Sequence, residues 1–363
     1  MKRLNIRKIG FTMVLGGCMA SQFLFAQSAQ SNAQQVQSQS WHLKKAFSQR
    51  HFSKLVPPGN YSGITHLHDD VYAVVSDKAD SAYFFYFRVQ IDSLTGKLQR
   101  VENLGFARCQ EKQKGFDREA IAKITDHSNG MDGTTGKLVI ASEGTYGLKE
   151  YAYDDKGVTD THLWEWTMPS DAFYPNYVFE SAAYDAGRQW LWTIPESCLR
   201  QDGIPASPQN PVPNRLRLMA FDMRSNTPVA SYVYQMDAPT THRKPQTYVM
   251  GVSELCALED GQLLVLEREA FVPKIKLGSF CKCKLYLVNP AQEQQAPFLK
   301  KRLLYEWKTS LSLFRYSFAN YEGMCLGPKL MDGSQVIILL SDSQDRYKGV
   351  LKDWFKTIVI RKS

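Results

Sequence analysis

The stretch FESAAYDAGRQWLWTIPES, residues 179–197, has the pattern of a β-hairpin with an acid near each end. We expect a first strand over 180–184, a turn at 185–188 and a second strand over 190–194 that leads into Glu196. Strands joined by a tight turn run antiparallel, so the start of the first lies beside the end of the second. Glu180 and Glu196 should therefore lie at the same edge of the sheet.

This hairpin pattern recurs along the chain. Each copy has a short strand, a turn rich in Gly, Asp or Asn, and an apolar strand that runs into Ser, Pro or an acid. The other copies are YSGITHLHDDVYAVVSD (61–77), DREAIAKI with KLVIASEG (117–144), VSELCALEDGQLLVLERE (252–269) and YEGMCLGPKLMDGSQVIILLSDS (321–343). Internal repetition of this length indicates a fold built from similar units.

Two more strand-like segments, rich in aromatic and β-branched residues, follow each of the first four hairpins. Units of four antiparallel strands without helices are typical of β-propeller blades. The fifth unit has only a third strand, over 354–362, and the segment 41–55 is free to supply its fourth. The sequence thus predicts an all-β propeller of five four-stranded blades, closed by strands from both ends of the chain. Six blades are the alternative if the long third or fourth unit contains another.

Acids recur at two positions of the repeat. The first-strand position holds Ser62, Glu119, Glu180, Glu254 and Glu322, and the end of the second strand holds Asp77, Glu143, Glu196, Glu267 and Asp342. The first strands of a propeller line its channel, so we expect these acids to converge on one mouth. So many carboxylates repel one another unless a cation lies among them or several are protonated. A divalent cation with oxygen ligands, most plausibly Ca²⁺, would balance them. The alternative is balance by internal ion pairs with Arg118, Arg268 and Lys78.

The N-terminal residues have the features of an export signal. Four cations between Lys2 and Lys8 precede an apolar stretch that ends at Ala26. Residues 1–26 are therefore predicted to be a signal peptide, 27–40 a disordered Gln/Ser linker and 41–363 the propeller domain. We expect a periplasmic or extracellular protein with no transmembrane span; the alternative is a lipoprotein anchored through Cys18, which follows a lipobox-like Leu-Gly-Gly.

Charge and cysteine content narrow the function classes further. Removal of the signal would lower the net charge from +8 by four, to about +4, so nucleic-acid binding has little support. The remaining cysteines lack the spacing of a small disulfide scaffold or of a zinc site; they are Cys109, Cys198, Cys256, Cys281, Cys283 and Cys325. His66 and His68 could ligate a metal together, but they lie near a turn, at the opposite end of the hairpin from the acids.

The segments DREAIA, FESAAYD, VSELCALEDGQLLVLERE and YEGMCLGP with LLSDS resemble the phytase-like family of secreted proteins, described as having "esterase-like activity of phytase". The likeness runs from about residue 50 to the C-terminus. It implies a β-propeller and a hydrolase that acts on small-molecule phosphate esters through Glu and Asp residues. Ser62 departs from the pattern, since an acid there would complete the ring.

The leading hypothesis is metal-assisted hydrolysis of a phosphate ester by a monomeric protein. In this hypothesis the ligands of Ca²⁺ are Glu119, Glu180, Glu254 and Glu322. Further ligands or the general base come from Glu143, Glu196, Glu267 and Asp342. The phosphate is held, or the neighbouring acids are neutralised, by Arg118 and Arg268.

Other catalytic schemes have less support. The chain has no Gly-x-Ser-x-Gly motif and no cysteine followed six residues later by arginine. Two hypotheses remain beside the leading one: a calcium-dependent lactonase-type hydrolase and a non-catalytic cell-surface binding propeller. The segments 200–214 and 269–280 should overhang the acidic mouth in any of the three.

Overall fold

A computed structural model describes residues 40–79, 82–108, 117–125, 135–154, 157–159, 161–292, 297–314 and 316–363. The predicted signal peptide, nearly all of the linker, Cys18 and Cys109 lie outside these residues. The fold is all-β, as expected, and its only helical segments among the described residues are the short 3₁₀ turns η1 (Ser170–Ala172) and η2 (Tyr347–Gly349).

The strands pair in five antiparallel sheets, which we number 1 to 5 in chain order from residue 61. Sheet 1 contains β3 (Tyr61–His68), β4 (Val71–Ser76), β5 (Ala82–Ile91) and β6 (Leu98–Arg108). Sheet 2 contains β7 (Arg118–Ile124), β8 (Gly136–Ser142), β9 (Gly147–Asp154), β10 (Gly157–Val158) and β11 (Trp164–Thr167). Sheet 3 contains β12 (Ala183–Asp185), β13 (Trp190–Thr193), β14 (Arg215–Asp222) and β15 (Thr227–Gln235). Sheet 4 contains β16 (Thr247–Ala257), β17 (Leu263–Val272), β18 (Ser279–Val288) and β19 (Lys301–Leu311).

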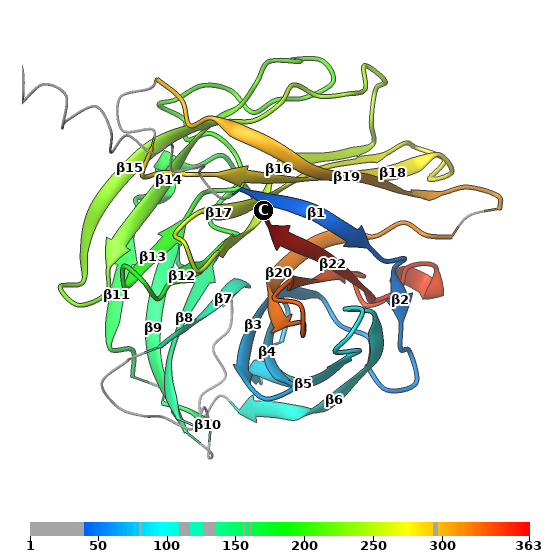
Figure 1. The fold of residues 1–363 in the computed structure, drawn as a ribbon. Coiled ribbons are helices and arrows are strands. Elements are labelled where there is room, and N and C mark those ends of the chain that lie inside the picture. Colours follow the sequence, from blue (N-terminus) through cyan, green and yellow to red (C-terminus); the bar gives the residue numbers. More distant parts are fainter. Residues whose placement is uncertain are drawn as a thin grey trace, which may run out of the picture. The chain divides into compact units, whose positions relative to one another are not determined.

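Sheet 5 joins the two ends of the described chain. It contains β20 (Asn320–Lys329), β21 (Gln335–Asp342) and β22 (Trp354–Lys362), with β1 (Trp41–Ala46) and β2 (Arg50–His51) paired to β22. Figure 1 shows β1, in blue, alongside the dark-red β22, and the register runs from Trp41 opposite Lys362 to Ala46 opposite Ile358. The predicted contribution of the segment 41–55 to the last sheet is confirmed.

The first strands of the sheets form a closed ring of contacts: β3 contacts β7, β7 contacts β12, β12 contacts β16, β16 contacts β20, and β20 contacts β3. A ring of radially arranged antiparallel sheets whose first strands surround an axis is a β-propeller. The chain therefore folds as a propeller, and its first strands face the channel as expected.

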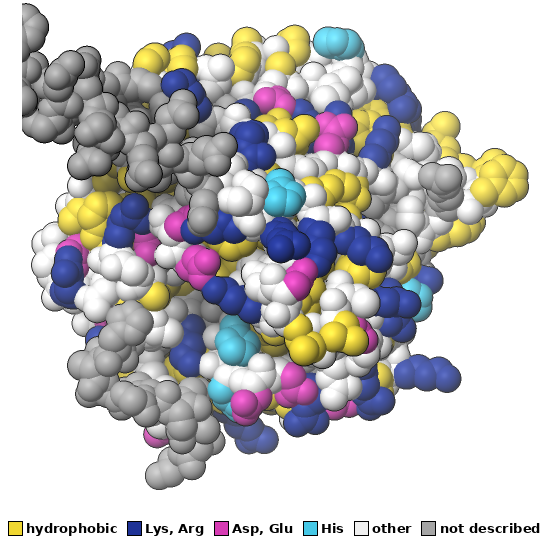
Figure 2. Space-filling model, viewed as in Figure 1, with side chains coloured by type: hydrophobic (Ala, Val, Ile, Leu, Met, Phe, Trp, Pro, Cys, Tyr) yellow, Lys and Arg dark blue, Asp and Glu magenta, His cyan; other side chains and the backbone are white. Residues whose placement is uncertain are grey.

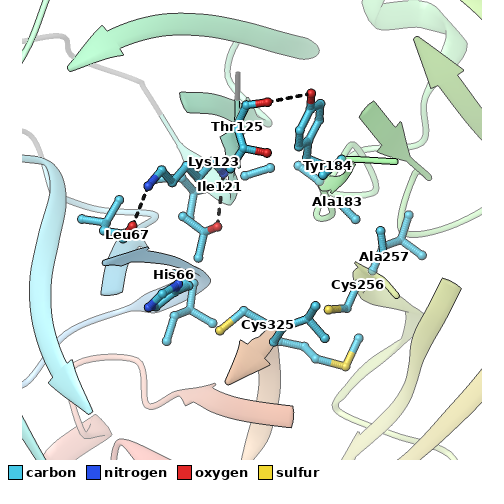
Figure 3. A pocket seen from close by; sticks show the side chains of 18 of the residues that line it. His66, Leu67, Ile121, Lys123, Thr125, Ala183, Tyr184, Cys256, Ala257 and Cys325 are labelled. Carbon is cyan, nitrogen blue, oxygen red and sulfur yellow. Dashed lines mark hydrogen bonds between the residues drawn. The ribbon is translucent and has the colours of Figure 1, made fainter. Parts of the chain in front are cut away.

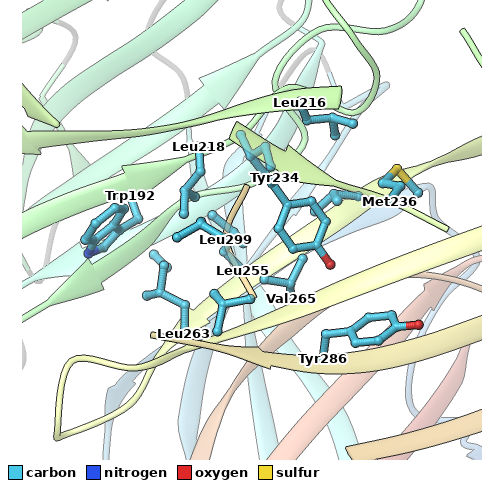
Figure 4. Close-up of a cluster of buried hydrophobic side chains, with 14 of the residues drawn as sticks. Trp192, Leu216, Leu218, Tyr234, Met236, Leu255, Leu263, Val265, Tyr286 and Leu299 are labelled. Atoms are coloured by element: carbon cyan, nitrogen blue, oxygen red, sulfur yellow. The ribbon is translucent and has the colours of Figure 1, made fainter. Parts of the chain in front are cut away.

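The hydrophobic core is divided into clusters that lie between neighbouring sheets. In the cluster between sheets 3 and 4, Trp192, Leu218 and Tyr234 pack against Leu263 and Val265 (Figure 4). Equivalent clusters lie between sheets 4 and 5, 5 and 1, 1 and 2, and 2 and 3. The burial of both faces explains why inner strands such as β4 and β21 are almost continuously apolar rather than alternating.

Candidate active site

The first two strands of the sheets bring acidic side chains to one end of the channel, which we call the acidic mouth. It contains Arg268 and eight carboxylates, from Asp77, Asp117, Glu119, Glu143, Glu180, Glu196, Glu322 and Asp342. Acids from different repeats therefore converge on one end of the channel, as predicted. The set differs from the predicted one because it includes Asp117 and excludes Glu254 and Glu267, as the strand pairing explains below.

A β-bulge lies at or beside the acid position of the first strand in four sheets. The pairing register slips between Tyr61 and Ile64, Arg118 and Ala120, Val252 and Glu254, and Tyr321 and Gly323. A bulge leaves one residue without an opposite partner and redirects its side chain. In sheets 2 and 5 that residue is Glu119 or Glu322, which both turn into the mouth. Glycine residues beside the bulges, such as Gly323 against the Ser62 carbonyl, allow neighbouring first strands to approach closely.

In sheet 4 the bulged residue is Ser253, not Glu254. Glu254 lies one residue further along, and a shift of one residue moves a side chain to the other side of its strand. Its buried carboxylate accepts hydrogen bonds from the backbone N–H of Ala182 (3.1 Å) and of Leu255 (2.9 Å). The structure thus separates Glu254 from the acids with which the sequence grouped it.

The same shift affects the second strand of sheet 4. In sheets 1, 2 and 5, the residue opposite the one before the bulge is a serine that an acid follows: Ser76, Ser142 and Ser341. In sheet 4 the residue at this place is Glu267, and Arg268 follows it. Glu267 accepts hydrogen bonds from Tyr234 (2.7 Å) and Lys301 (2.6 Å), away from the mouth. Arg268 therefore occupies the position that holds Asp77, Glu143, Glu196 and Asp342 in the other repeats.

Arg268 is the centre of one side of the mouth. Its buried guanidinium pairs with Glu180 (2.8 Å), Glu196 (2.7 Å) and Glu322, and Nη1 also donates to Asn320 Oδ1 (3.1 Å). Burial alone would lower the pKa of Arg268, but the three carboxylates outweigh it and raise this pKa above the ordinary value. The guanidinium is thus a permanent counter-ion for acids from sheets 3 and 5.

The residue opposite Arg268 allows this close packing. Gly251 pairs with Arg268 in the β16–β17 ladder. A Cβ atom on Gly251 would lie 2.3 Å from Cγ of Glu196 and 2.4 Å from the Glu196 carbonyl oxygen. Only glycine lets the backbone of Glu196 and its side chain cross β16 at this point.

Asp77, Asp117 and Glu119 form a second group, which we call the open acid group. Each offers a carboxylate oxygen, and these oxygens lie within 4.8 Å of one another. Asp77 Oδ1 and Asp117 Oδ1 are buried and have no hydrogen-bond partner among the described residues. The cation seen beside the group is Lys78, whose exposed side chain pairs with the other Asp77 oxygen at 2.9 Å.

The carboxylates on this side have raised pKa values. Burial raises the pKa of Glu119 well above its ordinary value, and the charges of Glu322 and Asp117 raise it further. Burial also raises the pKa of Asp117 and of Asp77, although Lys78 opposes both shifts. For Glu143, burial and the neighbouring Glu196 and Asp117 raise the pKa to about 7. Burial is the first cause of each shift, and it also raises the pKa of Glu180 and Glu322, where the Arg268 guanidinium opposes it.

The open acid group fits a divalent cation. Calcium takes carboxylate oxygens at about 2.3–2.6 Å, so oxygens on opposite sides of one ion are about 5 Å apart. The spacing of the three carboxylates satisfies this limit, and the two orphaned oxygens provide unused ligands. The sequence prediction included Glu119 in a metal site and noted Asp77 among the strand-end acids, but it did not single out Asp117.

Arg118 contacts residues of sheet 1, whereas Asn320 lies on the Arg268 side of the mouth. The buried Arg118 donates from Nη1 to the Ala79 carbonyl (3.1 Å) and lies over the ring of Tyr83, between sheets 1 and 2. Asn320 hydrogen-bonds both Arg268 and Glu322, a role that no sequence pattern indicated. Asp117 was detectable in principle, because it lies two residues before Glu119 in DREAIA.

The first strands also surround a cavity of about 280 Å³ at their other end (Figure 3). Its lining includes His66, Lys123, Tyr184, Cys256 and Cys325. His66 lies here beside the Asp69 carbonyl (3.0 Å), at the opposite end of the strands from the acids, as the sequence predicted. Among the described residues this lining is mainly apolar and contains no carboxylate, whereas the acids described above gather at the acidic mouth.

Comparison with known proteins places the sequence in a family. A family model described as "Phytase-like: Esterase-like activity of phytase" matches residues 56–344. None of the curated proteins compared matches the chain. Among the described residues, no helix has the length and apolar character needed to cross a membrane.

Several solved structures resemble the fold at low sequence identity. An endo-arabinase from Bacteroides thetaiotaomicron is 9% identical, with 84% of this chain and 96% of that chain covered and a TM-score of 0.44. The GH93 alpha-L-arabinofuranosidase of Fusarium graminearum is 11% identical, with 86% and 85% covered and a TM-score of 0.39. A DUF4623 family protein from Bacteroides eggerthii is 9% identical, with 90% and 77% covered and a TM-score of 0.36.

Proposed function

Because the chain belongs to the phytase-like family, we propose that it is a metal-dependent hydrolase of small-molecule phosphate esters whose active site is the acidic mouth. The observation that carries the proposal is the open acid group, in which three acids from sheets 1 and 2 converge and two buried oxygens have no hydrogen-bond partner among the described residues. We propose Ca²⁺ as the cation, because carboxylate oxygens are its usual ligands.

The proposal gives residues of the chain four roles: cation ligand, general base, counter-ion and substrate contact. Asp77, Asp117 and Glu119 would hold the cation, which when bound supplies a Lewis acid for the phosphoryl oxygens and lowers the pKa of a bound water. Glu143, with a pKa of about 7, would accept the proton of the attacking water near neutral pH and return it to the leaving group.

Arg268 would hold the acids of sheets 3 and 5 in place rather than bind the phosphate. Its two terminal nitrogens already donate to three carboxylates and to Asn320. Lys78 is the exposed cation at the mouth that could meet an incoming anion. Its flexible ammonium suits a substrate that arrives from solvent.

The proposal also covers the number of blades, the export of the protein and its oligomeric state. We take the ring of sheets as five blades, because its contacts and its five inter-sheet cores close on themselves. The protein is proposed to be exported, through either the signal or the lipoprotein route, and to act as a monomer without nucleic acid.

The direct test is hydrolysis of p-nitrophenyl phosphate and bis(p-nitrophenyl) phosphate by the purified full chain, with Ca²⁺ and with chelator. The decisive variant is Asp117→Asn/Glu119→Gln, and the matched control is Glu165→Gln/Glu259→Gln, which neutralises two exposed acids away from the mouth. We expect calcium-dependent turnover that falls at least 100-fold in the first variant and persists in the second.

Turnover of neither phosphate ester would overturn the proposal. Hydrolysis of a simple lactone in its place would favour the lactonase-type alternative. Calcium binding without turnover of either substrate class would favour a binding propeller. Turnover that survives in the Asp117→Asn/Glu119→Gln variant would move the active site away from the open acid group.

A further inference from the structure

A cavity of about 390 Å³ adjoins the acidic mouth between sheets 4 and 5. Two of its lining residues, Asn320 and Asp342, belong to the mouth or contact it directly. Binding sites for small organic ligands commonly have volumes of about 300–1,000 Å³ and mainly apolar walls. The size and position of this cavity are therefore those of a substrate subsite beside the charged centre.

The rest of the lining is largely apolar. It comes from the ends of β16 and β17 and from the loops that follow β17, β19 and β21. The apolar side chains that these loops contribute are Ile275, Leu277, Tyr316, Phe318, Val350 and Leu351. Ile275 is 80% exposed and Tyr316 is 57% exposed, although both could be covered by a ligand in the cavity. We call this space the apolar cavity.

Resting on the proposed function, we propose that the substrate is amphiphilic: its ester group meets the acidic mouth and an alkyl or aryl group attached to it occupies the apolar cavity. The charged and apolar regions meet at Asn320 and Asp342, so one molecule can reach both. An apolar group buried there would release water from exposed Ile275 and Leu277, which favours binding. A fully polar polyphosphate would leave these side chains exposed.

The occupant is a single amphiphilic molecule rather than a membrane surface. Leu313 and Phe314, 67% and 93% exposed, lie between the lining residues Leu311 and Tyr316 in the chain but do not line the cavity. Figure 2 shows hydrophobic side chains gathered at the edge where β19 ends in Figure 1. The cavity lining and this projecting edge are distinct, so variants can separate the two occupants.

The test measures binding of butanol, octanol and decanol, and of the matching alkyl phosphates below their aggregation concentrations, to the full chain by calorimetry. In the wild type, affinity should rise up to about fourfold for each added methylene until the cavity is full. Thr247→Trp, which fills the cavity from an exposed lining position, and Ile275→Asp, which places a charge there, should abolish this dependence. Phe314→Ser is the matched control and should retain it.

Three results would overturn the inference. The first is an affinity that does not depend on chain length, and the second is a dependence that survives in both cavity variants. The third is the loss of both the chain-length dependence and binding to phosphatidylcholine vesicles in Phe314→Ser. The alcohols test the cavity without a phosphate. If alcohols bind by chain length but the phosphate adds no calcium-dependent affinity, the cavity is supported and the phosphoesterase proposal fails. If the alkyl phosphates bind with calcium at the same affinity for all chain lengths, the phosphoesterase proposal is supported and the apolar cavity is not the substrate subsite.

Discussion

The two sides of the acidic mouth balance their charge in different ways. Around Arg268, three carboxylates share one buried guanidinium, which donates to one oxygen of each. In the open acid group, three carboxylates gather beside the exposed Lys78, and two of their buried oxygens have no hydrogen-bond partner among the described residues. Sheet 4 has Arg268 at the position where the other repeats have an acid, so the fold itself provides a counter-ion for the three carboxylates. The open acid group, whose Asp77 pairs with the exposed Lys78, is suited to a cation from solution.

The strongest test of this difference is calcium affinity. Asp117→Asn should lower the affinity of the protein for Ca²⁺ about 100-fold or more, because it removes a ligand and one unpartnered oxygen. Glu180→Gln, on the Arg268 side, should change it by no more than a few fold. Calorimetric titration of both variants decides the matter: equal losses would mean that the two sides form one metal site.

Removal of the fixed cation should affect stability more than calcium binding. Arg268→Met leaves Glu180, Glu196 and Glu322 without a counter-ion, and the loss of one member of a buried ion-pair set costs about 3–5 kcal/mol of unfolding free energy. Urea unfolding in chelator measures this loss.

Arg88→Met provides the control for that measurement. Arg88 also pairs with two acids, Asp70 and Glu102, but its side chain is exposed. Surface pairs contribute little, so the unfolding midpoint should hardly change. If the two arginine variants were equally stable, the buried guanidinium would not be the structural counter-ion described above.

The open side should also give the metal-free protein an unusual pH dependence. Burial and the nearby acids raise the pKa of Glu143 from 4.5 to about 7, so the folded state holds this proton more tightly than the unfolded state. The stability contributed by this protonation is complete below pH 4.5 and is lost as the pH rises to about 7. In chelator, the melting temperature should therefore fall across this window, and Glu143→Gln should flatten the change. Saturating calcium should remove most of this pH dependence, because the cation supplies positive charge beside the carboxylates. The same change of melting temperature with pH in the presence and absence of calcium would contradict this explanation.

Lys78 should have the smallest effect. Its ammonium pairs with Asp77 but is largely exposed, so it competes only weakly with a divalent cation. Lys78→Gln should tighten calcium binding by a few fold at low ionic strength, and the gain should shrink in high salt. Lys329→Gln, which removes an exposed lysine paired with Glu259 at the other end of the sheets, should leave the affinity unchanged. A large loss of affinity in Lys78→Gln would instead give this lysine a structural role.

Much of the fold could be predicted from local pattern. The alternation of short apolar strands and Gly- or Asp-rich turns located the hairpins, and the missing fourth strand after residue 362 indicated that residues near Trp41 would complete the last sheet. These features depend on the period of the strand and on turn chemistry, which are properties of a few neighbouring residues. The acid positions followed from the same alignment in sheets 1, 2, 3 and 5.

The membership of the site depended on tertiary structure. VSELCALEDGQLLVLERE contains acids close to both expected positions. A bulge at Ser253 and the pairing of Val252 with Glu267 instead bring Arg268 to the mouth and leave Glu254 and Glu267 with partners elsewhere. A one-residue shift is almost invisible in a repeat alignment, yet it moves a side chain to the other side of the strand. The sequence by itself determined the strands, their order and the end of the sheets at which acids gather. Only the folded ring decided which charges meet, because ion pairs between sheets depend on registers and bulges set by contacts among strands far apart in the chain.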